Sequence, residues 1–91
     1  MILKIFAVRD RATDQYGTPM FLISEGQAIC SFSDEVNRAA ADNMLYSHPD
    51  DYDLFELGEF DTMTACFECH SPAQIAIGKM VKVREVGTNV K

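Results

Sequence analysis

The sequence predicts an α+β domain over residues 1–91, in which a small antiparallel sheet of four to five strands carries one helix on one face, in the order β-β-α-β-β-β. Three observations support this fold class. The chain has short apolar runs rich in β-branched and aromatic residues, and it has one amphipathic segment with helical spacing. At 91 residues it has room for a single domain.

The first two strands are expected at residues 2–9 and 19–24. Residues 2–9 form a nearly continuous apolar run, which is typical of a central strand. Residues 10–18 are polar, contain Gly17 and predict a loop. Residues 19–24 are apolar again, and Pro19 is acceptable there because it opens the strand. A hairpin between the two strands is therefore expected.

A helix is expected to begin after Ser24. Ser24 and Gln27 have the spacing of a capping box, in which the serine accepts a hydrogen bond from the third helical amide and the glutamine reaches back. Helical character fades near residues 41–43, and His48-Pro49 forces a break, because a residue before proline avoids the helical region. The apolar stripe recurs at three- and four-residue steps and consists of Ala28, Ile29, Phe32, Val36, Ala39 and Ala40.

The remaining strands follow the break. Residues 52–61 alternate as a strand, and Gly58 interrupts the alternation, which indicates a bulge or a close approach of two backbones. Residues 61–64 predict a hairpin turn that leads into a strand at 65–70. At residues 80–86, Val81 and Val83 alternate with Lys82 and Arg84, and this pattern predicts the last strand.

Charge is unevenly distributed along the chain. The net charge of −6 argues against a protein that grips nucleic acid over its whole surface. Residues 34–68 contain ten acids and one base, whereas residues 69–91 contain four bases and one acid. Such a chain can present two faces of opposite sign, which suits self-association as well as local anion binding. An acidic surface that only confers solubility explains the same pattern.

The cysteines suggest cofactor chemistry that the predicted strand does not support. Cys66, Cys69 and His70 match the C-x-x-C-H pattern of covalent haem attachment. In an extended strand, however, residues three apart point to opposite faces, so the two thiols would not converge on one ligand. Zinc is disfavoured too, although His70, His48 or Cys30 could complete the ligands, since a zinc knuckle needs a tight turn and usually a second ligand pair. With no recognisable catalytic motif either, we expect no cofactor, no metal and no enzymatic activity.

The N-terminus predicts a cytoplasmic protein. Lys4 interrupts the first apolar run and Arg9-Asp10-Arg11 follows it, which is the reverse of the order in a secretory signal. No apolar run approaches the roughly 18 residues that a membrane span needs. We therefore expect no membrane contact, and we expect the three cysteines to be reduced.

Residues 48–61 carry the pattern H-P-x-D-Y-x-L-F-x-L-G-x-F-D, formed by His48, Pro49, Asp51, Tyr52, Leu54, Phe55, Leu57, Gly58, Phe60 and Asp61. This pattern resembles the signature of the small nonstructural protein of gokushovirus-type microviruses, which are single-stranded DNA bacteriophages. The expected helix resembles that family's A-I-x-x-F-[ST]-D-x-V-N segment through Ala28, Ile29, Phe32, Ser33, Asp34, Val36 and Asn37, and Lys4-Ile5-Phe6 resembles its opening strand. The resemblance implies a protein made in the host bacterial cytoplasm during infection and absent from the virion. Such a protein is thought to help switch replication from duplex copying to the synthesis and packaging of single strands.

Two classes of function follow from these observations. The first is a non-enzymatic single-stranded DNA binder, which needs a positive groove and aromatic platforms. Lys82 and Arg84 share one face of the expected last strand, and the first strand could pair beside it; the predicted nucleic-acid contacts are Lys4, Arg9, Arg11, Lys79, Lys82, Arg84 and Lys91. The predicted stacking residues are Tyr16, Phe21 and Phe67.

The alternative is an acidic protein-interaction module that contacts the replication initiator, the procapsid or a host factor. Its acidic middle would then serve as the contact surface, in the manner of a protein that mimics the charge of DNA. A domain of this size with apolar strands leaves an edge or a face for a second copy, so a homodimer is expected.

Overall fold

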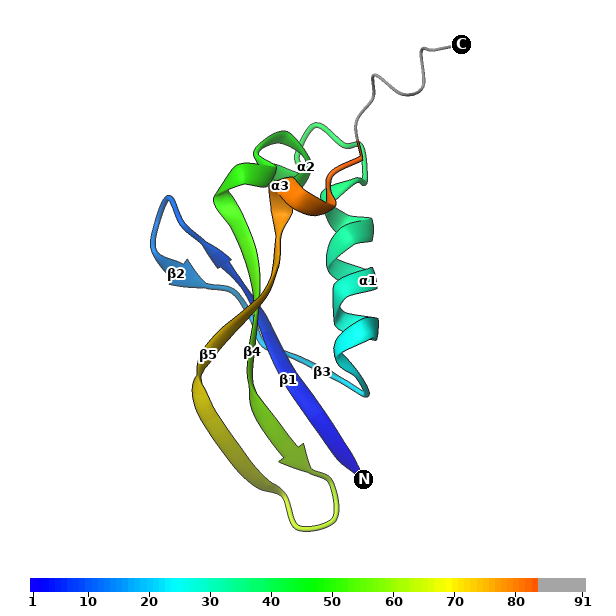
Figure 1. Ribbon diagram of the computed structural model, residues 1–91, viewed down its shortest axis with the longest axis vertical. Coiled ribbons are helices and arrows are strands. Elements are labelled where there is room, and N and C mark those ends of the chain that lie inside the picture. Colours follow the sequence, from blue (N-terminus) through cyan, green and yellow to red (C-terminus); the bar gives the residue numbers. More distant parts are fainter. Residues whose placement is uncertain (84–91) are drawn as a thin grey trace.

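The computed structural model describes residues 1–83 and contains one antiparallel sheet with a helix along one face (Figure 1). The strand order is β2-β1-β4-β5, and β3 pairs with β1 on the same side as β2. This arrangement confirms the α+β fold class. The elements are β1 (Ile2–Asp10), β2 (Gln15–Tyr16), β3 (Met20–Leu22), α1 (Glu25–Val36), α2 (Met44–Ser47), η1 (Pro49–Asp51), β4 (Tyr52–Asp61), β5 (Cys66–Ile77) and α3 (Gly78–Val81).

The central strand β1 confirms the first prediction. It pairs with β4 along its whole length, and on its other side it pairs with β3 near its start and with β2 near its end. The segment expected to be a loop contains the short strand β2, which follows a turn with Asp14 at φ 59°. The expected hairpin partner at residues 19–24 is β3, where Leu22 lies opposite Lys4 and Met20 opposite Phe6.

Helix α1 begins at the predicted cap. The Ser24 hydroxyl accepts a hydrogen bond from the Gln27 amide at 3.2 Å, and the Gln27 side chain accepts one from the Ile23 amide at 3.0 Å, one residue before the cap. Ala28, Phe32 and Val36 are buried along one stripe. They pack against Phe6 of β1 and Leu54 of β4, so the core lies between α1 and the central strands. This packing places the face of β1 that carries Phe6 toward the helix.

The helix ends earlier than its apolar stripe predicted. Asn37 is the C-cap of α1, and both its backbone amide and its side chain donate to the Ser33 carbonyl, at 3.1 and 2.8 Å. A local side-chain bond of this kind competes with continued helix, so Ala39 and Ala40 lie beyond the helical stripe. The predicted break at His48-Pro49 is confirmed, because α2 ends at Ser47 and η1 begins at Pro49.

The β4–β5 hairpin contains the expected irregularity at Gly58. The register shifts between Glu56 and Gly58, where three residues of β5 oppose one residue of β4. A Cβ atom on Gly58 would lie 2.3 Å from the Glu68 carbonyl oxygen, so the two backbones approach more closely than a side chain allows. Both the bulge and the close approach are therefore confirmed.

The strand predicted for residues 80–86 is wrong in its described part. The chain forms α3 from Gly78 to Val81 instead. The Asn37 side chain donates to the Val81 carbonyl at 3.0 Å and accepts from the Val83 amide at 2.7 Å, while Lys82 Nζ donates to the Tyr46 carbonyl at 2.9 Å. These bonds tie the segment to the ends of α1 and α2, and an alternating pattern cannot reveal them. Residues 84–91 lie outside the described residues.

Candidate functional site

The sheet presents an aromatic surface on the side turned away from α1. Leu3, Ile5 and Ala7 alternate with Phe6 on β1, so their side chains point to the opposite face. Residues directly opposite one another across a sheet share a face, and Phe21 lies opposite Ile5 while Phe60 lies opposite both Leu3 and Phe67. We call this surface the aromatic face and define it by Tyr16, Phe21, Phe60 and Phe67.

Three rings of the aromatic face form one cluster that joins β3, β4 and β5. The ring centroids of Phe60 and Phe67 are 4.7 Å apart, and Phe21 lies 5.8 Å from Phe60 and 6.2 Å from Phe67 in edge-to-face geometry. Phe21 is 42% exposed and Phe67 is 59% exposed. Part of each ring is therefore exposed to solvent, and a planar group could stack on that exposed surface.

Tyr16 forms a second aromatic position toward the other end of β1. Its ring meets the buried Phe55 ring edge to face, with centroids 5.5 Å apart, and Phe55 lies opposite Ala7. Tyr16 therefore shares the face of the Phe21, Phe60 and Phe67 cluster. The structure places all three predicted stacking residues on one face, and it brings Phe21 and Phe67 into contact.

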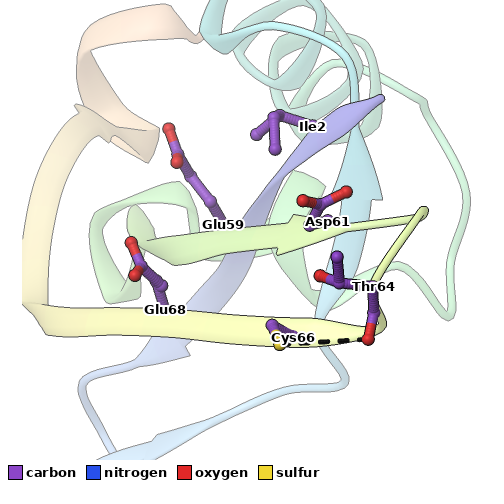
Figure 2. A pocket seen from close by; sticks show the side chains of 6 residues that line it. All are labelled: Ile2, Glu59, Asp61, Thr64, Cys66 and Glu68. Carbon is purple, nitrogen blue, oxygen red and sulfur yellow. Dashed lines mark hydrogen bonds between the residues drawn. The ribbon is translucent and has the colours of Figure 1, made fainter.

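The acids of the β4–β5 hairpin lie on the face of the sheet that α1 covers, beyond the start of the helix. Glu59 lies opposite Lys4 and Glu68, and Asp61 lies opposite Ile2 and Cys66. A hollow of about 320 Å³ is lined by Ile2, Glu59, Asp61, Thr64, Cys66 and Glu68. Figure 2 draws it with the 3.9 Å hydrogen bond from Cys66 to the Thr64 carbonyl. Like charges directly opposite in a sheet repel, and the 3.5 Å ion pair from Lys4 to Glu59 partly offsets this repulsion.

The predicted cations of the first strand are all paired. Lys4 binds Glu59 on the face of α1. Arg9 donates to the Asp14 carboxylate, and this hydrogen bond raises the pKa of the guanidinium. Arg11 donates to the Asp50 carbonyl at 2.6 Å and lies 3.4 Å from the carboxylate of the buried Asp53. Arg11 therefore fastens the turn after β1 to η1 and the start of β4.

The two C-terminal cations within residues 1–83, Lys79 and Lys82, lie in α3 and at its C-cap and not on a strand. Lys79 is exposed in α3. Lys82 caps that helix; its ammonium lies 3.5 Å from the Tyr46 ring centroid and donates to carbonyls of Val36 and Tyr46. Within residues 1–83, β1 pairs only with β2, β3 and β4, so the groove expected between β1 and the last strand is not formed there. Arg84 and Lys91 lie outside the described residues.

The cysteines and histidines do not converge in the described part of the chain. Cys30, Cys66 and Cys69 are free and exposed, and residues 1–83 hold no group of three or more potential metal ligands. His70 bonds the Ser71 carbonyl at 2.7 Å and lies 3.4 Å from a Glu56 carboxylate oxygen. The Ser71 bond and then the Glu56 bond raise the pKa of His70. This histidine therefore participates in the hairpin bulge.

The sequence did not identify Phe60 as part of the aromatic face, nor Asp14 as the partner of Arg9. Phe60 is part of the pattern at residues 48–61 and is not among the predicted stacking residues, although the turn predicted at residues 61–64 already implied that it would pair with a residue at the start of β5. Asp14 lay in a polar segment with no motif. Its role depends on the turn that carries its carboxylate back to Arg9, and this turn becomes visible only in the structure.

Comparisons with known proteins gave one match. A family model described as Phage ORF5 protein matches residues 3–83, which include every residue of the aromatic face. Searches of curated proteins and of solved structures found no match. Among residues 1–83, no helix has the length and apolar character needed to cross a membrane.

Proposed function

Because the chain belongs to the phage ORF5 protein family, we propose that it is a non-enzymatic phage protein that binds single-stranded DNA on the aromatic face of its sheet. On the resemblance described above, we propose further that the chain is a small nonstructural protein of a gokushovirus-type microvirus. The protein would then act in the host cytoplasm, in the synthesis and packaging of the single-stranded genome.

One observation supports this proposal most strongly, namely that rings and carboxylates lie on opposite faces of one hairpin. Phe60 and Phe67 turn away from α1, while their neighbours Glu59, Asp61 and Glu68 turn toward the side of the helix. A strand of DNA on the aromatic face is thus separated from these three carboxylates by the sheet. Stacking on aromatic rings is tolerant of sequence because every base has a flat face.

Replacing Phe67 with alanine tests the proposal directly. We expect the variant to lose about 1 to 3 kcal/mol of binding free energy per stacked base, measured by fluorescence anisotropy with an oligothymidine of roughly 12 nucleotides. Phe67 is 59% exposed, so the thermal unfolding midpoint should change little. Met63→Ala, at the exposed tip of the same hairpin, is the matched control and should bind like the wild type. If the wild-type protein fails to retain the oligonucleotide even at about 50 mM salt, the proposal is wrong.

The acidic hollow favours a second candidate, a module that binds a basic partner such as a replication or procapsid protein. Its carboxylates, Glu59, Asp61 and Glu68, surround a concave surface rather than a flat one. The two candidates respond differently to Glu68→Gln. Oligonucleotide binding should stay equal or strengthen, whereas binding of a basic protein partner should weaken and lose salt dependence.

The proposal includes self-association. Exposed apolar side chains in a small domain favour burial against a second copy, and β5 is an edge strand of the sheet that residues 1–83 form. Light scattering at micromolar concentration should therefore give twice the 10.2 kDa mass of the chain. A mass equal to that of a single chain would remove the dimer from the proposal without affecting the DNA contact.

A further inference from the structure

Arg9 stands at the end of the aromatic face that carries Tyr16. The two residues lie opposite one another in the β1–β2 pair, so their side chains share a face. On the other side of β1, Arg9 lies opposite Asp53, which is buried and is already paired with Arg11. The arginine is thus placed beside an exposed ring, where the backbone of a stacked nucleic-acid strand would need a positive charge.

In the free protein the Arg9 guanidinium forms an ion pair with one carboxylate, that of Asp14. Asp14 follows β1 in the turn to β2, and its side chain is 77% exposed where it receives the Arg9 bond. Arg11 and Lys82, in contrast, donate to backbone carbonyls, at 2.6 and 2.9 Å respectively, and hold separate segments together. Releasing either of those would disturb the fold. An exposed ion pair between an arginine and a carboxylate contributes little net stability, so another anion can replace the carboxylate.

We infer that Asp14 is an autoinhibitory residue that occupies Arg9 until a phosphate group of a single strand, stacked on the aromatic face, replaces the carboxylate. Arg9 donates one hydrogen bond from Nη2 to an Asp14 carboxylate oxygen, and a phosphate oxygen can accept the same bond from a guanidinium. The inference rests on the proposed function and assigns Arg9 as the phosphate contact of that site. It also explains how a protein with a net charge of −6 would limit its binding to strands that can stack.

Asp14→Asn tests the inference with little risk to the fold. Asp14 has a φ of 59°, in the left-handed region, which asparagine tolerates well. We expect the variant to bind the oligothymidine about threefold to tenfold more tightly at about 50 mM salt. The slope of log K against log salt should steepen by about 0.7, the value for one added phosphate contact on a single strand.

Glu35→Gln is the matched control. Glu35, in the last turn of α1, pairs at 2.6 Å with Arg38, which follows the C-cap Asn37. This change therefore also removes one carboxylate and frees one arginine, but at the end of the helix. Equal strengthening by the two variants would show a simple effect of net charge and would overturn the inference. So would a gain that persists when Asp14→Asn is combined with Arg9→Gln.

The outcomes separate the inference from the proposed function. If the wild type binds and Phe67→Ala weakens binding while Asp14→Asn changes nothing, the aromatic site stands and the autoinhibitory role of Asp14 is wrong. If neither the wild type nor Asp14→Asn binds the oligonucleotide at about 50 mM salt, where phosphate contacts are strongest, both are wrong.

Discussion

Replacing Gly58 with alanine is expected to destabilise the protein by about 3 kcal/mol or more, a large share of the roughly 5 to 15 kcal/mol that holds a small domain folded. The added Cβ would lie 2.3 Å from the Glu68 carbonyl oxygen and 2.6 Å from the Cys69 Cα atom. Both are backbone atoms, so no side chain can rotate away, and β4 would have to separate from β5. Gly58 also has a φ of 156°, which residues with side chains rarely adopt.

Chemical denaturation followed by circular dichroism measures this loss as a lower midpoint. Gly26→Ala is the matched control, because Gly26 lies in the first turn of α1 and its added Cβ would meet only the Ser24 hydroxyl, at 4.0 Å. That variant should gain up to about 1 kcal/mol, since alanine favours helix over glycine. Equal midpoints for Gly58→Ala and the wild type would contradict the geometry of the hairpin.

Local signals predicted the parts of the fold that local forces determine. The Ser24 cap and the break at His48-Pro49 depend on residues that are close in sequence, and both were found where they were expected. Gly58 was informative for a different reason, because a glycine inside an apolar alternating strand has few explanations other than a close backbone approach. The strand at residues 2–9 followed from its apolar run, and the strand at residues 52–61 followed from its alternation.

Contacts distant in sequence determine what was missed. The segment at residues 81–83 alternates as a strand would. It turns instead, because the Asn37 side chain donates to the Val81 carbonyl and accepts from the Val83 amide. The pairing of β1 with both β2 and β3 likewise depends on the turn at Asp14, not on apolar character. Alternation indicates that a segment can lie on a pleated surface, and it carries no information about a distant amide that competes for its backbone.

The candidate site divides in the same way. Phe21 and Phe67 were predicted as stacking residues on strands and Tyr16 as one in a loop, and the structure places all three on one face. The cationic groove was inferred from a last strand expected beside the first one, and within residues 1–83 β1 pairs with β2, β3 and β4 instead. The strand pattern also does not show which cations are paired with acids. Lys4 and Arg9 are each neutralised by an acid that folding brings close, Glu59 from 55 residues away and Asp14 from five.

Asn43→Asp is expected to destabilise the protein by about 3 kcal/mol at pH 7, although the two side chains have the same shape. Asn43 is 4% exposed, and its side-chain NH₂ group donates to the carbonyls of Glu35 and Arg38, both at 2.8 Å. Its side-chain oxygen accepts from the Leu45 amide at 3.1 Å. It thus closes the end of α1 and caps α2 at once. A carboxylate keeps the cap but turns an acceptor toward two carbonyl oxygens.

The pH dependence distinguishes this repulsion from a simple loss of bonds. Burial and the facing carbonyls disfavour the charged form, so the introduced carboxyl should have a folded pKa above its unfolded value of about 3.9. Between those two pKa values the folded state binds more protons than the unfolded state, so the penalty relative to wild type should shrink as pH falls through the folded pKa. Asn43→Ala, which loses the same donors without adding charge, should cost about 2 kcal/mol at every pH. Denaturation of the three proteins from pH 7 to about pH 4 measures both differences. Parallel curves for the two variants would mean that the Asn43 amide group does not face the Glu35 and Arg38 carbonyls in solution.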